Sequence, residues 1–255
     1  MFDAGLGYSA INTARSALSS FLDHINGCSA GNLPLVKRLL KGVSQLRPSE
    51  PRYQFTWDVK IVLSFLESLY PLSDISLKNL TLKLTMLMVL LTAQRVQTLS
   101  KLDINYMFVD ENKVIFTINK ILKHSRPNKT ATPIELSKYS NEALCVVTTL
   151  RTYLETTKDL RKGHSQLFLS YLKPHCPVTA STISRWIKVV MMKAGINTSV
   201  FKSHSTRAAA TSAAHFANVN VELIMKAAGW TNVSTFAKFY KKPIQENTWA
   251  DAILS

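Results

Sequence analysis

His204 and Arg207 stand three positions apart in the stretch FKSHSTRAAATSAAHFA, residues 201–217. Two groups that can carry positive charge, at the start of a run of small helix-forming residues, could bind an anion such as a phosphate. The N-terminus of a helix also favours an anion, and small neighbours would leave room for it to approach. The alternative is an ordinary helix start capped by Ser203 or Ser205. Because an H-x-x-R pattern often arises by chance, other residues must decide.

The distribution of charge favours a polyanionic partner. The chain of 255 residues has a formal net charge of +15, and its pI is near 9.8. Residues 185–242 hold nine Lys or Arg against the single acid Glu222, and residues 112–134 hold five basic residues and no acid. Nucleic acid is the expected partner. A membrane is not, because the apolar run at 84–93 is too short to cross a bilayer.

Other classes of protein are disfavoured. The first residues lack the charged start and continuous apolar core of a secretory signal, so we expect an intracellular protein. The three cysteines, Cys28, Cys145 and Cys176, are widely spaced and form no C-x-x-C pair. We therefore expect reduced structural thiols, with no disulfide, no metal site and no cofactor.

The elements that must position these groups begin with a short helical region. Residues 1–43 read as a partial N-terminal helical domain, and residues 44–54, which contain two prolines and no regular period, read as a linker. Residues 55–255 then form the larger domain. Its first elements are an amphipathic helix at 57–70 and a long apolar helix that ends near Ala93 or continues through a bend.

The remainder of the larger domain is expected to be mainly α-helical with a small antiparallel β-sheet. Residues 113–119 and 130–136 have the composition of strands, and the polar segment between them is too basic for a core, so together they predict a basic hairpin. Helices are expected near residues 141–156, 179–194, 205–216, 219–227 and 232–240.

Six residues in order along this domain carry a resemblance to a known family. They are Arg95 in TAQRVQTLSKL, Lys123 in KILKHSRPNK, His204 and Arg207 in SHSTR, Trp230 in AAGW and Tyr240 in STFAKFY. From about Leu84 to its end, the chain is similar to the tyrosine recombinases, also called phage-type integrases. Within that family, the phrases QRVQTL, LKHSRP and GWTNVSTFAKFY most resemble recombinases of DIRS-type retrotransposons, followed by those of Crypton elements.

The resemblance implies the tyrosine recombinase catalytic fold, preceded by a short helical domain, and a role for each residue. Arg95 and Arg207 would neutralise a DNA phosphate through bidentate donors, and His204 and the Trp230 indole would add further donors. Tyr240 would attack phosphorus and hold the 3′ end, and Lys123 would protonate the departing 5′ oxygen. No metal or ATP would be needed. Each residue also has an ordinary alternative, since Arg95 could stabilise a helix C-terminus and Trp230 could belong to the core.

The resemblance also implies partners and a setting. Double-stranded DNA would be held by further basic residues, and a homotetramer would form on it through a Holliday-junction intermediate, in the nucleus for a eukaryotic mobile element. The expected DNA contacts are Lys120, Arg126, Lys129, Lys202, Lys238, Lys241 and Lys242. Lys120 and Lys129 also compete with Lys123 for the role of general acid.

Three features depart from the family pattern. Thr98 stands where many relatives have an acid, so the orientation of Arg95 would rest on backbone groups. The usual spacing would put the nucleophile at Phe239, which implies a shift of one residue to Tyr240. The N-terminal helical region is short for the family. Two other classes therefore stay open, a type IB topoisomerase and a catalytically silent DNA-binding protein.

Overall fold

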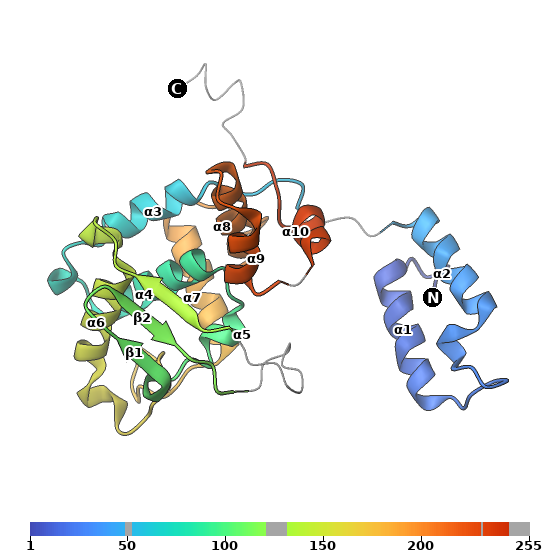
Figure 1. Cartoon of the computed structure of the whole chain (residues 1–255), viewed down its shortest axis with the longest axis horizontal. Coiled ribbons are helices and arrows are strands. Elements are labelled where there is room, and N and C mark those ends of the chain that lie inside the picture. Colours follow the sequence, from blue (N-terminus) through green and yellow to red (C-terminus); the bar gives the residue numbers. More distant parts are fainter. Residues whose placement is uncertain (49–52, 121–131, 231, 245–255) are drawn as a thin grey trace, which may run out of the picture. The chain divides into compact units, whose positions relative to one another are not determined.

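The structure is a computed structural model that describes residues 1–48, 53–120, 132–230 and 232–244. The chain divides into two units, Met1–Tyr53 and Gln54–Ser255, shown as ribbons in Figure 1. Among the described residues, no helix is long and apolar enough to cross a membrane. Cys28, Cys145 and Cys176 are all free thiols.

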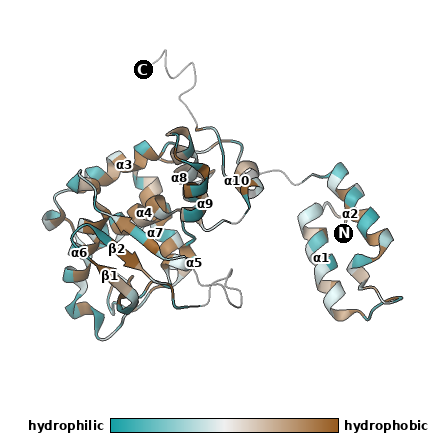
Figure 2. Ribbon diagram, in the orientation of Figure 1, coloured by the Kyte–Doolittle hydropathy of each residue, from teal (hydrophilic) through white to brown (hydrophobic). Residues whose placement is uncertain are grey.

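The N-terminal unit is a pair of helices with a small core. Helix α1 (Tyr8–Phe21) is followed by a 3-10 turn (Ala30–Asn32) and helix α2 (Pro34–Leu46). Proline suits the first position of α2, where its missing N–H is not needed. Both helices carry teal and brown along their length in Figure 2, and their apolar sides bury Ile11, Leu40 and Val43.

The boundary of the linker differs from the sequence prediction. Helix α2 extends to Leu46, so the first three residues of the predicted linker, 44–46, are helical. Val43 lies in the core of this unit, and the helix that buries it continues for almost another turn before the prolines interrupt it.

Helices form most of the larger unit. Helix α4 (Leu77–Thr92) is buried along nearly its whole length and contacts α6, α7 and α8. The hydroxyl of Ser76 caps its start by accepting from the Asn79 N–H, and Ala93 ends it in the left-handed conformation. The other helices are α3 (Val59–Glu67), α5 (Val96–Leu99), α6 (Val146–Thr157), α7 (Ala180–Lys193), α8 (Ser205–Phe216), α9 (Val221–Ala228) and α10 (Val233–Phe239).

A three-stranded antiparallel sheet completes the larger unit, in the order β1 (Met107–Val109), β2 (Lys113–Phe116), β3 (Ile134–Ser137). Val114, Phe116, Ile134 and Leu136 alternate along β2 and β3 and are buried, because β3 packs against α4 and α6. The fold is therefore mainly α with a small antiparallel sheet, as the sequence predicts. The strands are shorter than predicted, β1 is additional, and the loop that joins β2 to β3 lies largely outside the described residues.

Helix α8 explains the run of small residues differently from the sequence argument. Ala208, Ala209 and Ser212 are buried, and α8 packs on α3, α4 and α9. Their small side chains allow the helices to approach closely. The expectation that these residues leave open space for an anion is therefore wrong for these three positions. Figure 1 shows α8, α9 and α10, in orange and red, together in the larger unit.

Candidate active site

Arg207 lies in the first turn of α8 with only 5% of its surface exposed. Its Nη2 donates to the backbone carbonyl of Ala228 at the end of α9. Its Nε and Nη1 are buried and have no hydrogen-bond partner among the described residues. Buried donors are almost always paired in proteins, so these two guanidinium donors retain the capacity to bind an acceptor such as an anion.

Arg95 is close enough to Arg207 to change its titration. The pKa of Arg207 is lowered to about 10, first because the guanidinium is buried and second because of the charge on Arg95, while Tyr240 acts in the opposite direction. Arg207 therefore remains protonated at neutral pH. Among the described residues, the recorded ion pairs involve neither arginine. The two guanidinium groups leave a local excess of positive charge that a phosphate would neutralise.

Trp230 and Tyr240 form the wall beside Arg207. The centroids of their rings are 4.3 Å apart, and the guanidinium carbon of Arg207 lies 4.5 Å from the Trp230 ring centroid and 5.5 Å from that of Tyr240. The buried indole Nε1 of Trp230 has no hydrogen-bond partner in the described part of the chain. Like the two Arg207 donors, it is a buried donor with no such partner near the Tyr240 ring.

Trp230 also belongs to a small core, as the sequence left open. Its ring packs with Tyr240 against the buried cluster of Ile224, Met225 and Phe236, from α9 and α10. The centroids of Trp230 and Phe236 are 5.8 Å apart. Packing of this kind holds a large aromatic ring in one orientation, so the structural role and the role as a donor coexist.

Tyr240 reaches this position because α10 has ended. The helix closes at Phe239, and Tyr240 has φ −124° and ψ −24°, outside the helical conformation. The spacing usual in the resembled family would select Phe239 as the nucleophile. On a continuous helix, the side chain of the next residue would point about 100° away from it. Beyond the end of the helix, the Tyr240 ring lies against Trp230 and Arg207.

The loop before α5 places Arg95. Helix α4 ends at Thr92, and Arg95 occupies the position before the first residue of α5. The Thr98 N–H donates to the Arg95 carbonyl at 2.8 Å, and Thr98 is buried. Next to Arg95, the Gln94 side chain donates to the Ala227 carbonyl at 2.7 Å. Gln94 and Arg207 thus hold consecutive carbonyls at the end of α9, directly before Gly229 and Trp230.

His204 occupies the N-cap position of α8 with an exposed side chain. The prediction that Ser203 or Ser205 caps this helix is wrong. The Ser203 hydroxyl forms a hydrogen bond with the Ser184 hydroxyl, and the Ser205 hydroxyl accepts from the indole N–H of Trp57 at 2.9 Å. Both serines fix the start of α8 to other elements, which leaves its N-terminal side without a serine cap.

The expected basic contacts differ in their surroundings. Lys123, Arg126 and Lys129 lie outside the described residues, as does the side chain of Lys238. Lys120 is exposed, with its ammonium group 3.6 Å from Asp103, and Lys241 is exposed. Lys202 donates to the carbonyls of Thr198 and Ser199. Lys242 is only 8% exposed, and this burial is not predicted from the sequence.

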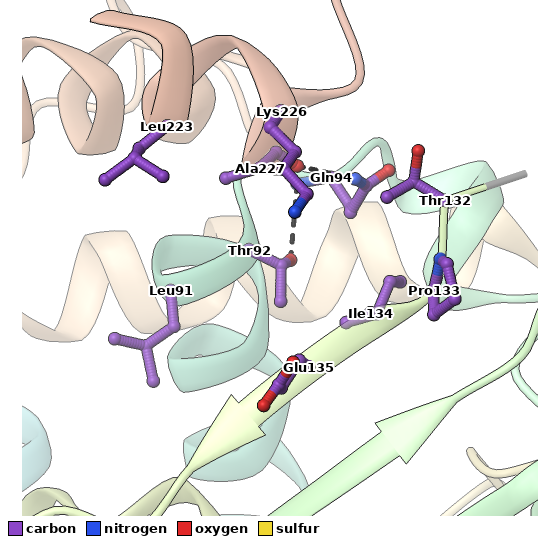
Figure 3. A pocket seen from close by; sticks show the side chains of 10 residues that line it. All are labelled: Leu91, Thr92, Gln94, Thr132, Pro133, Ile134, Glu135, Leu223, Lys226 and Ala227. Carbon is purple, nitrogen blue, oxygen red and sulfur yellow. Dashed lines mark hydrogen bonds between the residues drawn. The ribbon is translucent and has the colours of Figure 1, made fainter. Parts of the chain in front are cut away.

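An open cleft of about 380 Å³ lies beside Gln94, as Figure 3 shows. The end of α4, the start of β3 and α9 form its walls, with Glu135 on β3 and Lys226 on α9 among the lining residues. The other lining residues are Leu91, Thr92, Thr132, Pro133, Ile134, Leu223 and Ala227. In the described part of the chain, no group of three or more His, Cys, Asp or Glu side chains could hold a metal ion.

Solved structures share this fold. The chain resembles the Tn1549 transposon integrase in complex with transposon right end DNA, with a TM-score of 0.60, 16% identity, and coverage of 100% of this chain and 80% of that one. It also resembles the XerH site-specific recombinase bound to a palindromic difH substrate, with a TM-score of 0.59, 13% identity, and coverage of 91% of this chain and 63% of that one. For the XerA recombinase, the TM-score is 0.54 and the identity 18%, with coverage of 97% of this chain and 81% of that one.

The chain thus spans less than two thirds of the length of XerH. No curated protein sequence matches it significantly. Its residues 63–246 match the Phage integrase family, a range that includes Arg95, His204, Arg207, Trp230 and Tyr240. The chain belongs to the phage integrase family.

Proposed function

We propose that the protein is a site-specific DNA recombinase that cleaves and rejoins DNA strands through a 3′-phosphotyrosine intermediate. The observation that supports this most directly is the position of Tyr240 against Arg207 and Trp230. The buried Nε and Nη1 of Arg207 and the buried Nε1 of Trp230 have no hydrogen-bond partner among the described residues. A phosphodiester bound to these donors would place its phosphorus within reach of the tyrosine hydroxyl.

The chemistry assigns one step to each group. The Tyr240 oxygen forms a bond to phosphorus and releases its proton to solvent, while the bond from phosphorus to the 5′ oxygen breaks. Lys123 gives a proton to that departing oxygen. Arg95, Arg207, Trp230 and His204 stabilise the added negative charge on the nonbridging oxygens. Because the phosphotyrosine bond retains the energy of the phosphodiester, the 5′ hydroxyl can reverse the reaction without ATP.

The proposed substrate is double-stranded DNA carrying sites of a mobile element. The net charge of +15 supports attraction to a polyanion, and the structurally similar Tn1549 integrase is described in complex with transposon right end DNA. We assign the further contacts to Lys120, Arg126, Lys129, Lys202, Lys238 and Lys241, and no longer to Lys242, because that residue is buried. The sequence resemblance favours one form of this proposal, in which a homotetramer acts on DNA in the nucleus for a DIRS-type or Crypton element.

A nicked suicide duplex tests the proposal. Such a duplex loses a short piece after cleavage, which traps the covalent complex. Duplexes made from the DNA that flanks the coding region should give a protein–DNA band on a denaturing gel with the wild-type chain in the presence of EDTA. Tyr240→Phe should bind the same DNA with an equal Kd and give no band.

Three other outcomes would contradict the proposal. DNA binding without a covalent band from the wild type would indicate a silent binding protein. A covalent band that needs added metal would exclude the metal-independent mechanism. Relaxation of supercoiled plasmid without recombination of paired sites would indicate a topoisomerase.

A further inference from the structure

Ser212 connects the helix that carries Arg207 to the backbone of Tyr240. It lies on α8 and its surface is fully buried. Its hydroxyl donates to the Tyr240 carbonyl at 2.7 Å and accepts from the Lys242 N–H at 2.9 Å. A serine hydroxyl has one proton to donate. Here that proton and one lone pair both form hydrogen bonds with the backbone of a segment 28 to 30 residues further along the chain.

These two bonds replace partners that a helix would have supplied. The N–H groups of Tyr240 and Lys241 both donate to the Phe236 carbonyl at 2.9 Å, which marks the end of α10. Beyond this point the chain has no helical partner for the Tyr240 carbonyl or the Lys242 N–H. Tyr240 is therefore held by α10 through its N–H and by α8 through its carbonyl.

The segment after Lys242 is fixed from another side. The Thr56 N–H donates to the Pro243 carbonyl at 2.8 Å, and Thr56 forms a parallel bridge with Ile244. This contact limits how far the segment can move, but it acts three residues beyond Tyr240. Ser212 acts on the Tyr240 carbonyl itself.

The placement of Ser212 on α8 gives it a specific consequence. Arg207 and Ser212 are five residues apart on one helix, a separation of about 7.5 Å along its axis. A helix is rigid over this length, so the guanidinium that would hold the phosphate and the hydroxyl that holds the nucleophile's backbone keep a constant separation. A displacement of about 1 Å at a reacting group can lower a rate by ~100-fold.

We propose that Ser212 is a positioning residue that sets the distance from the Tyr240 hydroxyl to the phosphate bound at Arg207. This inference rests on the proposed recombinase function. Ser212 touches neither DNA nor the reacting atoms and acts through the Tyr240 and Lys242 backbone. Without its hydroxyl, a carbonyl and an N–H lose their common partner, and the end of α10 can shift relative to α8.

The experiment compares Ser212→Ala, Ser212→Cys and a matched control on the same helix, Thr211→Val. The Thr211 hydroxyl is also buried, but it donates to the Arg207 and Ala208 carbonyls of its own helix. Each full-length variant is assayed on the nicked duplexes that the wild type cleaves. The single-turnover cleavage rate is measured at saturating DNA, the Kd for the same DNA separately, and thermal unfolding without DNA.

We expect Ser212→Ala to lower the cleavage rate by ~10- to 100-fold with an unchanged Kd. Ser212→Cys, whose thiol forms longer and weaker hydrogen bonds, should lower it less, and it also tests the inference if the alanine variant does not fold. Thr211→Val should cleave at the wild-type rate. The inference would be overturned if Ser212→Ala or Ser212→Cys cleaved at the wild-type rate. It would also be overturned if Thr211→Val lost as much of the cleavage rate as the Ser212 variants. Either result would leave the recombinase function intact. A wild type that forms no covalent complex would overturn both.

Discussion

The rings of Trp230 and Tyr240 lie with their centroids 4.3 Å apart, and the Arg207 guanidinium carbon is 4.5 Å from the tryptophan ring centroid. This arrangement joins α8, the end of α9 and the end of α10 around one point. The indole N–H has no hydrogen-bond partner in the part of the chain that the structure describes. We therefore propose both a packing role and a donor role for Trp230, which substitutions can separate.

Trp230→Phe keeps an aromatic ring against Tyr240 but removes the N–H. If that donor stabilises the transition state, the single-turnover cleavage rate should fall by ~100-fold, the effect of removing one preorganised donor. Trp230→His retains a ring N–H and should keep a larger share of the rate. The order of the rates on a suicide duplex checks this, and a histidine variant slower than the phenylalanine variant would contradict the donor role.

Arg207→Met should increase the stability of the DNA-free protein while abolishing cleavage. The guanidinium is buried, two of its donors have no hydrogen-bond partner among the described residues, and the Arg95 charge lies near it. A buried charge without an ion-pair partner costs free energy, so its removal should stabilise the DNA-free protein by more than the loss of the hydrogen bond to the Ala228 carbonyl destabilises it, and methionine sulfur packs well against aromatic rings. Urea denaturation measures the change.

Inorganic phosphate provides the control for Arg207→Met. A ligand that binds the folded state raises its stability, so phosphate should stabilise the wild type more than the methionine variant, when compared with sodium chloride at equal ionic strength. Equal stabilisation of both proteins would show that Arg207 does not hold the anion. A strongly destabilised variant would show that the guanidinium is a structural group.

Lys83 should make stability depend on pH in the alkaline range. This fully buried residue of α4 donates to the Leu69 carbonyl at 2.6 Å. Its pKa is lowered from 10.5 to about 8, because burial disfavours the ammonium form, although Glu67 acts in the opposite direction. Between these two values the unfolded state binds more protons than the folded state, so the contribution of Lys83 to stability rises as pH increases through this range.

The matched variant for this effect is Lys83→Met, which fills similar volume without a charge. Below pH 8 the variant should exceed the wild type in stability by the largest margin, and the margin should narrow as pH approaches 10.5. Urea denaturation at several pH values gives both curves. A margin that is constant or widens with pH would show that Lys83 does not titrate in this way.

Trp57→Phe should destabilise the larger unit. The Trp57 indole donates to the Ser205 hydroxyl at 2.9 Å, and both residues are buried. Phenylalanine would leave that hydroxyl without its donor and open a small cavity, at a cost of ~1–3 kcal/mol. Denaturation of Trp57→Phe and of the double variant with Ser205→Ala checks the pair, since removing both polar groups should recover part of the loss.

Local patterns in the sequence were sufficient for most helices of the larger unit. The predicted helix at 205–216 agrees with α8 (Ser205–Phe216), and the prediction at 179–194 is within one residue of α7 at each end. Strand β1 has three residues, too few for a periodic pattern to show. The strand after it is shorter than predicted, because chain composition does not reveal where pairing stops.

The contacts that complete the site could not be read from local pattern. Ser212 is one of several small residues in α8, and its partners are backbone groups near Tyr240. Gln94 likewise bonds a carbonyl 133 positions away. Such bonds arise from tertiary packing. Its sequence context predicts Tyr240 as the nucleophile, but the orientation of its ring depends on where α10 ends, which capping residues indicate only to within a residue or two.

The proposed phosphotyrosine mechanism is best tested by identifying the amino acid that becomes linked to DNA. The wild-type chain is trapped on a nicked suicide duplex, the complex is digested with protease and nuclease, and the modified peptide is sequenced by mass spectrometry. We expect a nucleotide attached through phosphate to Tyr240. A modified residue other than Tyr240, or cleavage with no protein-linked nucleotide, would contradict the mechanism.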